Sequence, residues 1–170
     1  MKTKYLAIIL TLVLVFFIGC DEDSITDALL GTNSVTLSGD INKSFDAKSV
    51  AGMIYEDSTS GFVVLMQPED SGPNSSDDIL TLLQESDALP AVGNYSISID
   101  GNSSGDFGAL YIANDSTLYT MHSGSVKITE SSTSKVAGTF DLTGYYGFMM
   151  DPTREIKITG QFSSIPLDLD

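Results

Sequence analysis

The segment Arg154-Glu155-Ile156-Lys157-Ile158-Thr159-Gly160 (REIKITG) alternates apolar and polar side chains, and Ser125–Glu130 (SVKITE) has the same alternation. Successive side chains of a β-strand point to opposite faces, so a period of two predicts strands with one buried face. In both segments the aliphatic side chains would face a core, while lysine, threonine and glutamate would face water. The last third of the chain is therefore predicted to form antiparallel β-structure.

The same alternation continues towards the N-terminus, in Val35 and Leu37 and in the stretch NYSISID at 94–100. Phe62–Met66 (FVVLM) is a continuous apolar run, as expected of a strand covered on both faces. Asp78–Gln84 (DILTLLQ) fits a strand or one or two helical turns, and we favour a strand because another strand pattern restarts at 92–95. Turn-forming residues separate these segments, for example at 56–61 and 114–116.

These segments predict an all-β fold of about nine to ten short strands. Both an antiparallel β-sandwich and a closed β-barrel satisfy the pattern. We expect three parts: a signal peptide at 1–19, with an N-terminal signal helix; an acidic tether at 20–33; and a single β domain at 34–170.

Charge and composition exclude several classes of function. The 170 residues include 8 Lys and Arg against 23 Asp and Glu, a formal charge of −15. A chain this acidic is repelled by nucleic acid, which is therefore not an expected partner. With one His, one Cys and no Trp, the chain lacks the residues for a disulfide, a His/Cys metal site or a tryptophan sugar platform. We find no catalytic constellation and expect no enzyme.

The N-terminus has the pattern of an export signal. Lys2 and Lys4 precede a 14-residue apolar run, Tyr5–Ile18, which is short for a membrane-spanning helix. The ending Phe17-Ile18-Gly19-Cys20 resembles the lipobox of bacterial lipoproteins. That resemblance implies cleavage before Cys20 and fatty acylation of Cys20, for example with palmitate, which would anchor the protein in a membrane. An ordinary secretory leader with an incidental cysteine is the alternative.

Two further features resemble lipoproteins of the Bacteroidota. Asp21-Glu22-Asp23, directly after Cys20, is similar to their surface-export signal. The order G-S-V-K-I-T (124–129), V-A-G-T-F (136–140) and I-K-I-T-G-Q-F (156–162) is similar to the C-terminal signature of small, uncharacterised outer-membrane lipoproteins with an all-β body. The resemblance implies the fold and a position on the cell surface, and it carries no catalytic residue.

The loop at 100–106 allows two weaker interpretations. Asp100, Asn102, Ser104 and Asp106 alternate like the first half of a calcium loop, with Gly105 in sixth place, but Tyr111 stands where the closing acid is expected. Calcium is the one cofactor that we consider, and a solvated turn is favoured over it. Residues 101–105 also match G-x-S-x-G, but a hydrolase would need a helix after this elbow, and a strand is predicted there.

Two patterns concern the surface. The Asp-Ser-Ile and Asp-Ser-Thr sequences at Ser24, Ser58 and Ser116 are similar to acceptors of protein O-glycosylation in Bacteroidota envelopes. Residues 145–150 (YYGFMM) are strongly apolar. They would form a contact surface if exposed at a loop tip, although a strand covered on both faces is the favoured interpretation.

The sequence thus predicts a lipid-anchored protein of the bacterial outer membrane, facing the cell surface, with a non-catalytic binding or structural role. Its expected partners are the membrane, through the anchor, and an envelope protein or glycan that the sequence does not identify. A lipocalin-like carrier of a small apolar ligand is the alternative, and a small hydrolase is the least favoured.

Overall fold

The computed structural model describes residues 33–56, 59–71, 78–99, 105–148 and 151–169. These residues form ten β-strands. The strands in chain order are β1 (Asn33–Gly39), β2 (Lys43–Glu56), β3 (Thr59–Pro68), β4 (Ile79–Glu85), β5 (Gly93–Ser96), β6 (Phe107–Ile112), β7 (Leu118–Ser132), β8 (Lys135–Tyr146), β9 (Asp151–Ser164) and β10 (Pro166–Leu169).

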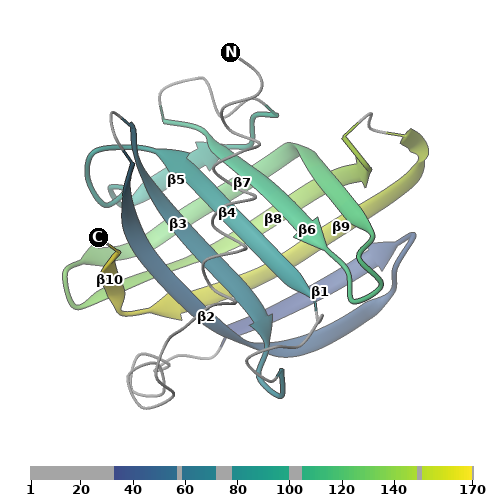
Figure 1. Ribbon diagram of the computed structural model, residues 1–170, viewed down its shortest axis with the longest axis horizontal. Helices are drawn as coiled ribbons and strands as arrows, with labels where there is room; N and C mark the ends of the chain where they lie inside the picture. Colours follow the sequence, from purple (N-terminus) through teal and green to yellow (C-terminus); the bar gives the residue numbers. More distant parts are fainter. Residues whose placement is uncertain (1–32, 57–58, 72–77, 100–104, 149–150, 170) are drawn as a thin grey trace.

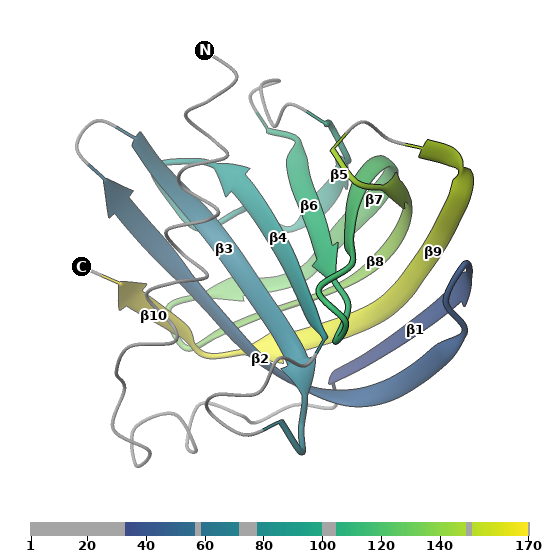
Figure 2. The same ribbon diagram turned by 45° about the vertical axis from the view of Figure 1, so that its right-hand side comes forward.

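Eight of these strands close into an antiparallel barrel (Figures 1 and 2). The hydrogen-bonded order is β1-β9-β8-β7-β6-β4-β3-β2, and β2 pairs in turn with β1. Val35 of β1 lies opposite Phe45 of β2 on one edge and opposite Gly160 of β9 on the other. Of the two predicted architectures, the closed barrel is therefore confirmed, and the sandwich is not formed.

Two short strands complete the barrel where neighbouring long strands separate. β1 pairs with β2 only as far as Ala47, and β10 then pairs with β2 in parallel, from Ala51 to Ile54. On the opposite side, β6 pairs with β7 over three residues, 118–120 of β7, and β5 takes over from Ser125 to Ile128. Each short strand satisfies backbone groups that a buried sheet cannot leave unpaired.

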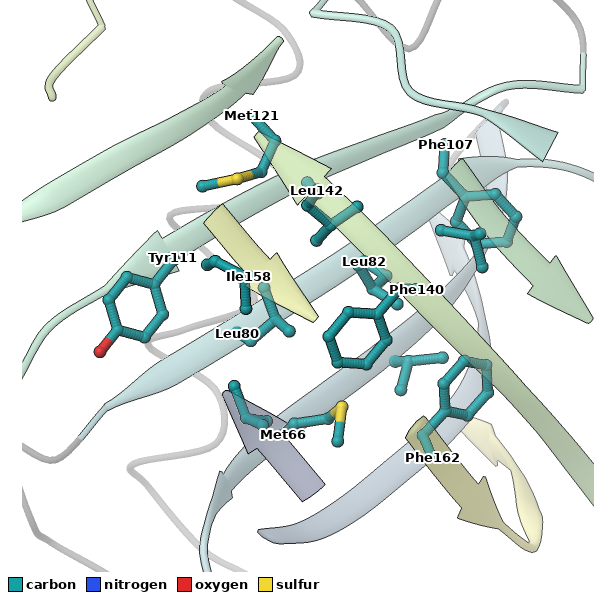
Figure 3. Close-up of a cluster of buried hydrophobic side chains, with 14 of the residues drawn as sticks. Met66, Leu80, Leu82, Phe107, Tyr111, Met121, Phe140, Leu142, Ile158 and Phe162 are labelled. Carbon is teal, nitrogen blue, oxygen red and sulfur yellow. The ribbon is translucent and has the colours of Figure 1, made fainter. Parts of the chain in front are cut away.

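The inward face of every barrel strand supplies the core, as the alternation in the sequence predicted. Val126 and Ile128 of β7 and Ile156 and Ile158 of β9 are fully buried. Side chains from opposite walls meet in the interior (Figure 3). The largest fully buried side chains are Tyr111, Tyr119, Phe62, Phe107, Phe162, Met66, Leu80, Leu82, Met121, Ile128, Leu142 and Ile156.

The repeated pattern Gly-x-Phe in β8 and β9 has a packing explanation. In the antiparallel register Gly138 lies opposite Phe162, and Phe140 lies opposite Gly160. Each phenylalanine ring therefore lies over the glycine of the other strand. A Cβ on Gly138 would come within 2.9 Å of the Phe162 ring, and one on Gly160 within 2.6 Å of the Phe140 ring. The two glycines make room for two rings in the barrel interior.

Most of the predicted strands are observed, and one boundary is wrong. Asp78–Gln84 was correctly assigned to a strand, which is β4 (Ile79–Glu85). The strand predicted at 94–100 is shorter: β5 ends at Ser96, Ile97 makes only an isolated bridge to Phe107, and Ile99 is 50 % exposed. Beyond Ser96 the chain passes from β7 towards β6: the Ile97 N–H donates to the carbonyl of Gly124 on β7, and the Ser98 N–H donates to the carbonyl of Phe107 on β6. The predicted signal helix and tether lie outside the described residues.

Replacing Gly160 with alanine should destabilise the barrel. The new methyl group would collide with the Phe140 ring and with the backbone carbonyl of Ser34. Overpacking of this kind costs about 1–3 kcal/mol, which urea unfolding would measure. Thr159→Ala, on the exposed outer face of the same strand, is the control and should change the free energy of unfolding by less than about 0.5 kcal/mol. Equal unfolding midpoints for the Gly160→Ala variant and the wild type would contradict the packing described here.

Candidate functional site: the polar end of the barrel

Charged and tyrosine side chains gather at one end of the barrel, where the turns after β1, β3, β6 and β8 lie. We call this cluster the polar end. It is formed by Asp40, Lys43, Asp78, Tyr111, Tyr119, Tyr146 and Arg154. Several of these side chains point into the barrel because they continue the inward phase of their strands. Lys43, for example, lies two residues before Phe45 and opposite the buried Leu37.

The first half of the polar end is a partly buried ion pair. The Lys43 ammonium lies 2.5 and 2.6 Å from the two carboxylate oxygens of Asp78. The Tyr111 hydroxyl donates a hydrogen bond to Asp78 Oδ1, and the backbone N–H of Asn114 donates a longer one of 3.3 Å. The Asp78 side chain is only 9 % exposed. Its charge is therefore compensated by a cation and two donors, as a buried carboxylate requires.

The second half joins the turn after β1 to β7 and β9. The Arg154 Nε donates to Asp40 Oδ2 at 2.9 Å, and the Tyr119 hydroxyl donates to the same oxygen. Arg154 Nη2 in turn donates to the Tyr119 hydroxyl at 3.3 Å. The Arg154 guanidinium also stacks on the ring of Tyr146, 4.1 Å from its centroid, which is a favourable cation–π distance.

The two halves meet through Tyr111 and Tyr119, which are opposite each other on β6 and β7 with ring centroids 6.1 Å apart. Burial, strengthened by the hydrogen bond to Asp78, raises the pKa of Tyr111 far above its ordinary value. Burial and then the hydrogen bond to Asp40 raise the pKa of Tyr119 to about 12. The Tyr119 hydrogen bond, followed by Arg154, lowers the pKa of Asp40 against the opposing effect of desolvation. At neutral pH both tyrosines therefore remain donors and Asp40 remains a carboxylate.

The hydrogen bonds and ion pairs of this cluster close one end of the barrel. Each donor described here has an acceptor within the cluster, and neither tyrosine has the lowered pKa that a general base or nucleophile needs. The cluster links β2, β6, β7, β8 and β9 and three of the turns at this end of the barrel. Beneath it, aromatic, methionine and aliphatic side chains from opposite walls occupy the interior (Figure 3).

Most of the residues predicted as sites lie outside the described residues. This is true of Cys20, of Asp21, Glu22 and Asp23, of Ser24 and Ser58, and of Asp100, Asn102 and Ser104 of the calcium hypothesis. Asp106 is described and half-buried just before β6. Within the described ranges no group of three His, Cys, Asp or Glu side chains is placed to hold a metal ion. In the same ranges no helix has the length and apolar character needed to cross a membrane.

Ser116, the third predicted glycosylation site, lies in the turn between β6 and β7. It is exposed and has a φ of 66°. Its backbone N–H donates to the carbonyl of Ala113, and the preceding Asp115 accepts a 2.9 Å bond from the Thr117 N–H. The turn thus presents the Ser116 side chain to solvent, while its modification stays a prediction.

Two other interpretations of the sequence have clear structural outcomes. The segment after the G-x-S-x-G pattern is strand β6 and not the helix that a nucleophile elbow requires. The apolar stretch at 145–150 was predicted to be covered on both faces, which is wrong for two of its described residues: Tyr146 is 39 % and Phe148 57 % exposed. The cause is that β8 ends at Tyr146, so Phe148 lies beyond the last strand pairing.

None of the hydrogen bonds and ion pairs of the polar end was predicted from the sequence. The sequence does contain a sign of this cluster. Lys43 and Asp78 are charged residues at inward-facing positions, two residues before Phe45 and Leu80. A charge at such a position, next to a turn, indicates a paired group at the end of a barrel. The partner cannot be identified from the sequence, because Lys43 and Asp78 are 35 residues apart.

Comparisons with known proteins assign no family: no protein-family model, curated protein or solved structure matches this chain.

The two ion pairs of the polar end should differ in their importance for stability. Lys43→Met keeps the apolar stem but leaves the Asp78 carboxylate buried without its cation, which should cost about 1–3 kcal/mol. Arg154→Met removes the cation from the more exposed Asp40 and should cost clearly less, because exposed pairs contribute little. Urea unfolding at pH 7 of both variants tests this, and an equal loss in the two would contradict the assignment of Asp78 as the buried partner.

Proposed function

We propose that this chain is a lipid-anchored protein of the bacterial cell envelope that acts as a non-catalytic binding or structural module. In this proposal the leader is removed before Cys20, and acyl chains on Cys20 hold the protein in the outer membrane. Asp21–Asp23 direct it to the cell surface, and an envelope protein or glycan is its partner. The position of the only cysteine, directly after a small residue at the end of an apolar run, supports the anchor.

The filled interior of the barrel is the observation that supports a binding or structural role over that of a ligand carrier. Bulky side chains such as Phe62, Phe107 and Phe162 are fully buried inside it, and the polar end closes one mouth. An eight-stranded barrel is just wide enough for side chains to fill. A partner would then be bound on the outer surface, to which the barrel contributes a rigid scaffold.

A lipocalin-like carrier remains the second candidate, and two observations favour it. Closed eight-stranded barrels also hold single small ligands in known proteins. In addition, Gln84 Oε1 is a buried acceptor without a hydrogen-bond partner among the described residues, on an inward-facing position between Phe62 and Phe107. A carrier would bind one fluorescent fatty acid per barrel in a saturable manner. A filled barrel would not.

Metabolic labelling tests the proposed anchor directly. Cells that express the full chain and are grown with an alkyne analogue of palmitate should label the wild-type protein and leave the Cys20→Ala variant unlabelled. Addition of a protease to intact cells should then degrade the wild-type protein, because it faces outward. An unlabelled wild-type protein would contradict lipid anchoring. A labelled protein that resists the protease would contradict only the surface position.

A further inference from the structure

The end of the barrel opposite the polar end is built from aromatic side chains. It lies where the turns after β2, β4 and β7 are. Figure 3 shows Phe107 and Tyr111, both on β6, on opposite sides of the buried cluster. We call this end the aromatic end and define it by side chains at inward-facing positions: Tyr55, Phe62, Gln84, Tyr95 and Phe107.

Gln84 is the polar member of this end, and one of its atoms is unpaired. The side chain is buried and lies opposite Phe62 on β3 and Phe107 on β6. Its Nε2 donates a 2.9 Å hydrogen bond to the carbonyl of Gly105, which identifies Oε1 as the acceptor end of the amide. Oε1 is buried and accepts no hydrogen bond from the described residues. Because an unpaired buried acceptor is costly, a donor bound at this oxygen would be strongly favoured.

The groups around Gln84 offer a ligand apolar contacts. Phe107 packs edge-to-face against Phe62 and against Tyr95, with ring centroids 6.4 and 5.4 Å apart. The Tyr95 hydroxyl already donates a 2.6 Å hydrogen bond to the carbonyl of Ala91. A ligand here would therefore contact aromatic rings and one free acceptor, which is the combination that fixes small apolar molecules in protein sites.

Two observations limit the size of such a ligand and its point of entry. Leu82, the next inward residue of β4 towards the polar end, is fully buried in the core. A long chain could not pass it without displacing the core packing. Tyr55 lies two residues after the buried Met53, in the same inward phase, yet it is 51 % exposed. A ligand would therefore enter beside Tyr55 and remain near this end.

The charges of the aromatic end disfavour an anion. Glu85 and Asp87 are exposed at the end of β4 and just beyond it, and Asp106 is half-buried just before β6. Lys135, at the start of β8, is paired with Glu130 at 3.0 Å. A carboxylate such as that of a fatty acid would be repelled by the acidic side chains and has no proton to donate to the buried acceptor. A neutral N–H or O–H donor avoids both problems.

We propose that the aromatic end binds a small neutral ring molecule that donates one hydrogen bond, from an N–H or O–H group, to Gln84 Oε1. This inference rests on the second candidate function, a carrier of a small apolar ligand, and gives that carrier a compact ring as its ligand in place of a fatty acid. Phe62, Tyr95 and Phe107 provide the apolar contacts. Gln84 is the residue that distinguishes a ring with a donor from one without.

Indole is a suitable probe, because it is a compact neutral ring with a single N–H donor. The chain contains no tryptophan, so indole fluorescence can be excited where the protein absorbs little. 1-Methylindole has the same ring without the donor and is the matched control. In titrations of the chain from residue 20 with Cys20→Ala, we expect saturable binding of one indole per barrel. Indole should bind at least about fivefold more tightly than 1-methylindole.

Substitution of the acceptor tests the role of Gln84. Gln84→Met removes the amide and keeps the length of the side chain, so indole and 1-methylindole should bind it with about equal dissociation constants. Gln67→Met is the same change at a half-buried position of β3 outside the aromatic end, and it should leave the preference for indole unchanged. A cooperative urea transition shows that each variant is folded, and the comparison of the two rings on the wild type stands without the variants.

Three results would overturn the proposal. Absence of saturable indole binding to the wild type would mean that the aromatic end is not a ligand site. Equal binding of the two rings to the wild type would support a carrier but remove the hydrogen bond to Gln84. A preference for indole that persists in Gln84→Met would mean that the methyl group is rejected by its size. Saturable binding of a fatty acid without indole would support the carrier function and contradict this ligand class, and none of these results depends on acylation of Cys20.

Discussion

The pairing of β1 with two partners is the interaction on which the structure depends. β1 bonds to β2, its neighbour in sequence, and to β9, more than a hundred residues later. Without the second pairing, β1 and β9 would be edges of an open sheet, each with unpaired backbone groups. With it, the sheet encloses an interior that must be filled by side chains or by a ligand. The composition of the core, the glycine positions and the polar end all follow from this closure.

The interior shows how a small barrel is filled. Aromatic rings and methionines occupy its length. Gly138 and Gly160 make room for two phenylalanine rings that would otherwise collide with the neighbouring strand. At the end where four turns meet, charges replace apolar groups, and each charge is paired within the cluster. This division follows from solvation: an apolar side chain near the open mouth would gain little from burial, whereas a paired charge there can still contact water.

The local structure was predictable from the sequence, and the long-range partners were not. Alternation at Val126 and Ile128, and again at Ile156 and Ile158, correctly predicted strands and their buried faces. The reason is that the polarity of each side chain decides whether its position faces the core or water. Whether the strands formed a sandwich or a barrel depended on the pairing of β1 with β9, for which a single sequence carries no signal. The polar end was missed for the same reason, since Lys43 and Asp78 meet only after closure. The anchor at Cys20 lies outside the described residues and stays a prediction.

The barrel is closed and buried side chains occupy its interior, so a partner of the kind proposed would bind on the outer surface. Closure of the barrel requires β1 to be an interior strand of the sheet, paired with both β2 and β9. Amide hydrogen exchange by NMR on the mature Cys20→Ala chain tests it most directly. We predict that the amides of Val35, Thr36 and Leu37 are protected within about tenfold of those of Phe140 and Leu142, in the centre of β8. Exchange of the β1 amides at the rate of a solvent-exposed turn would contradict closure of the barrel.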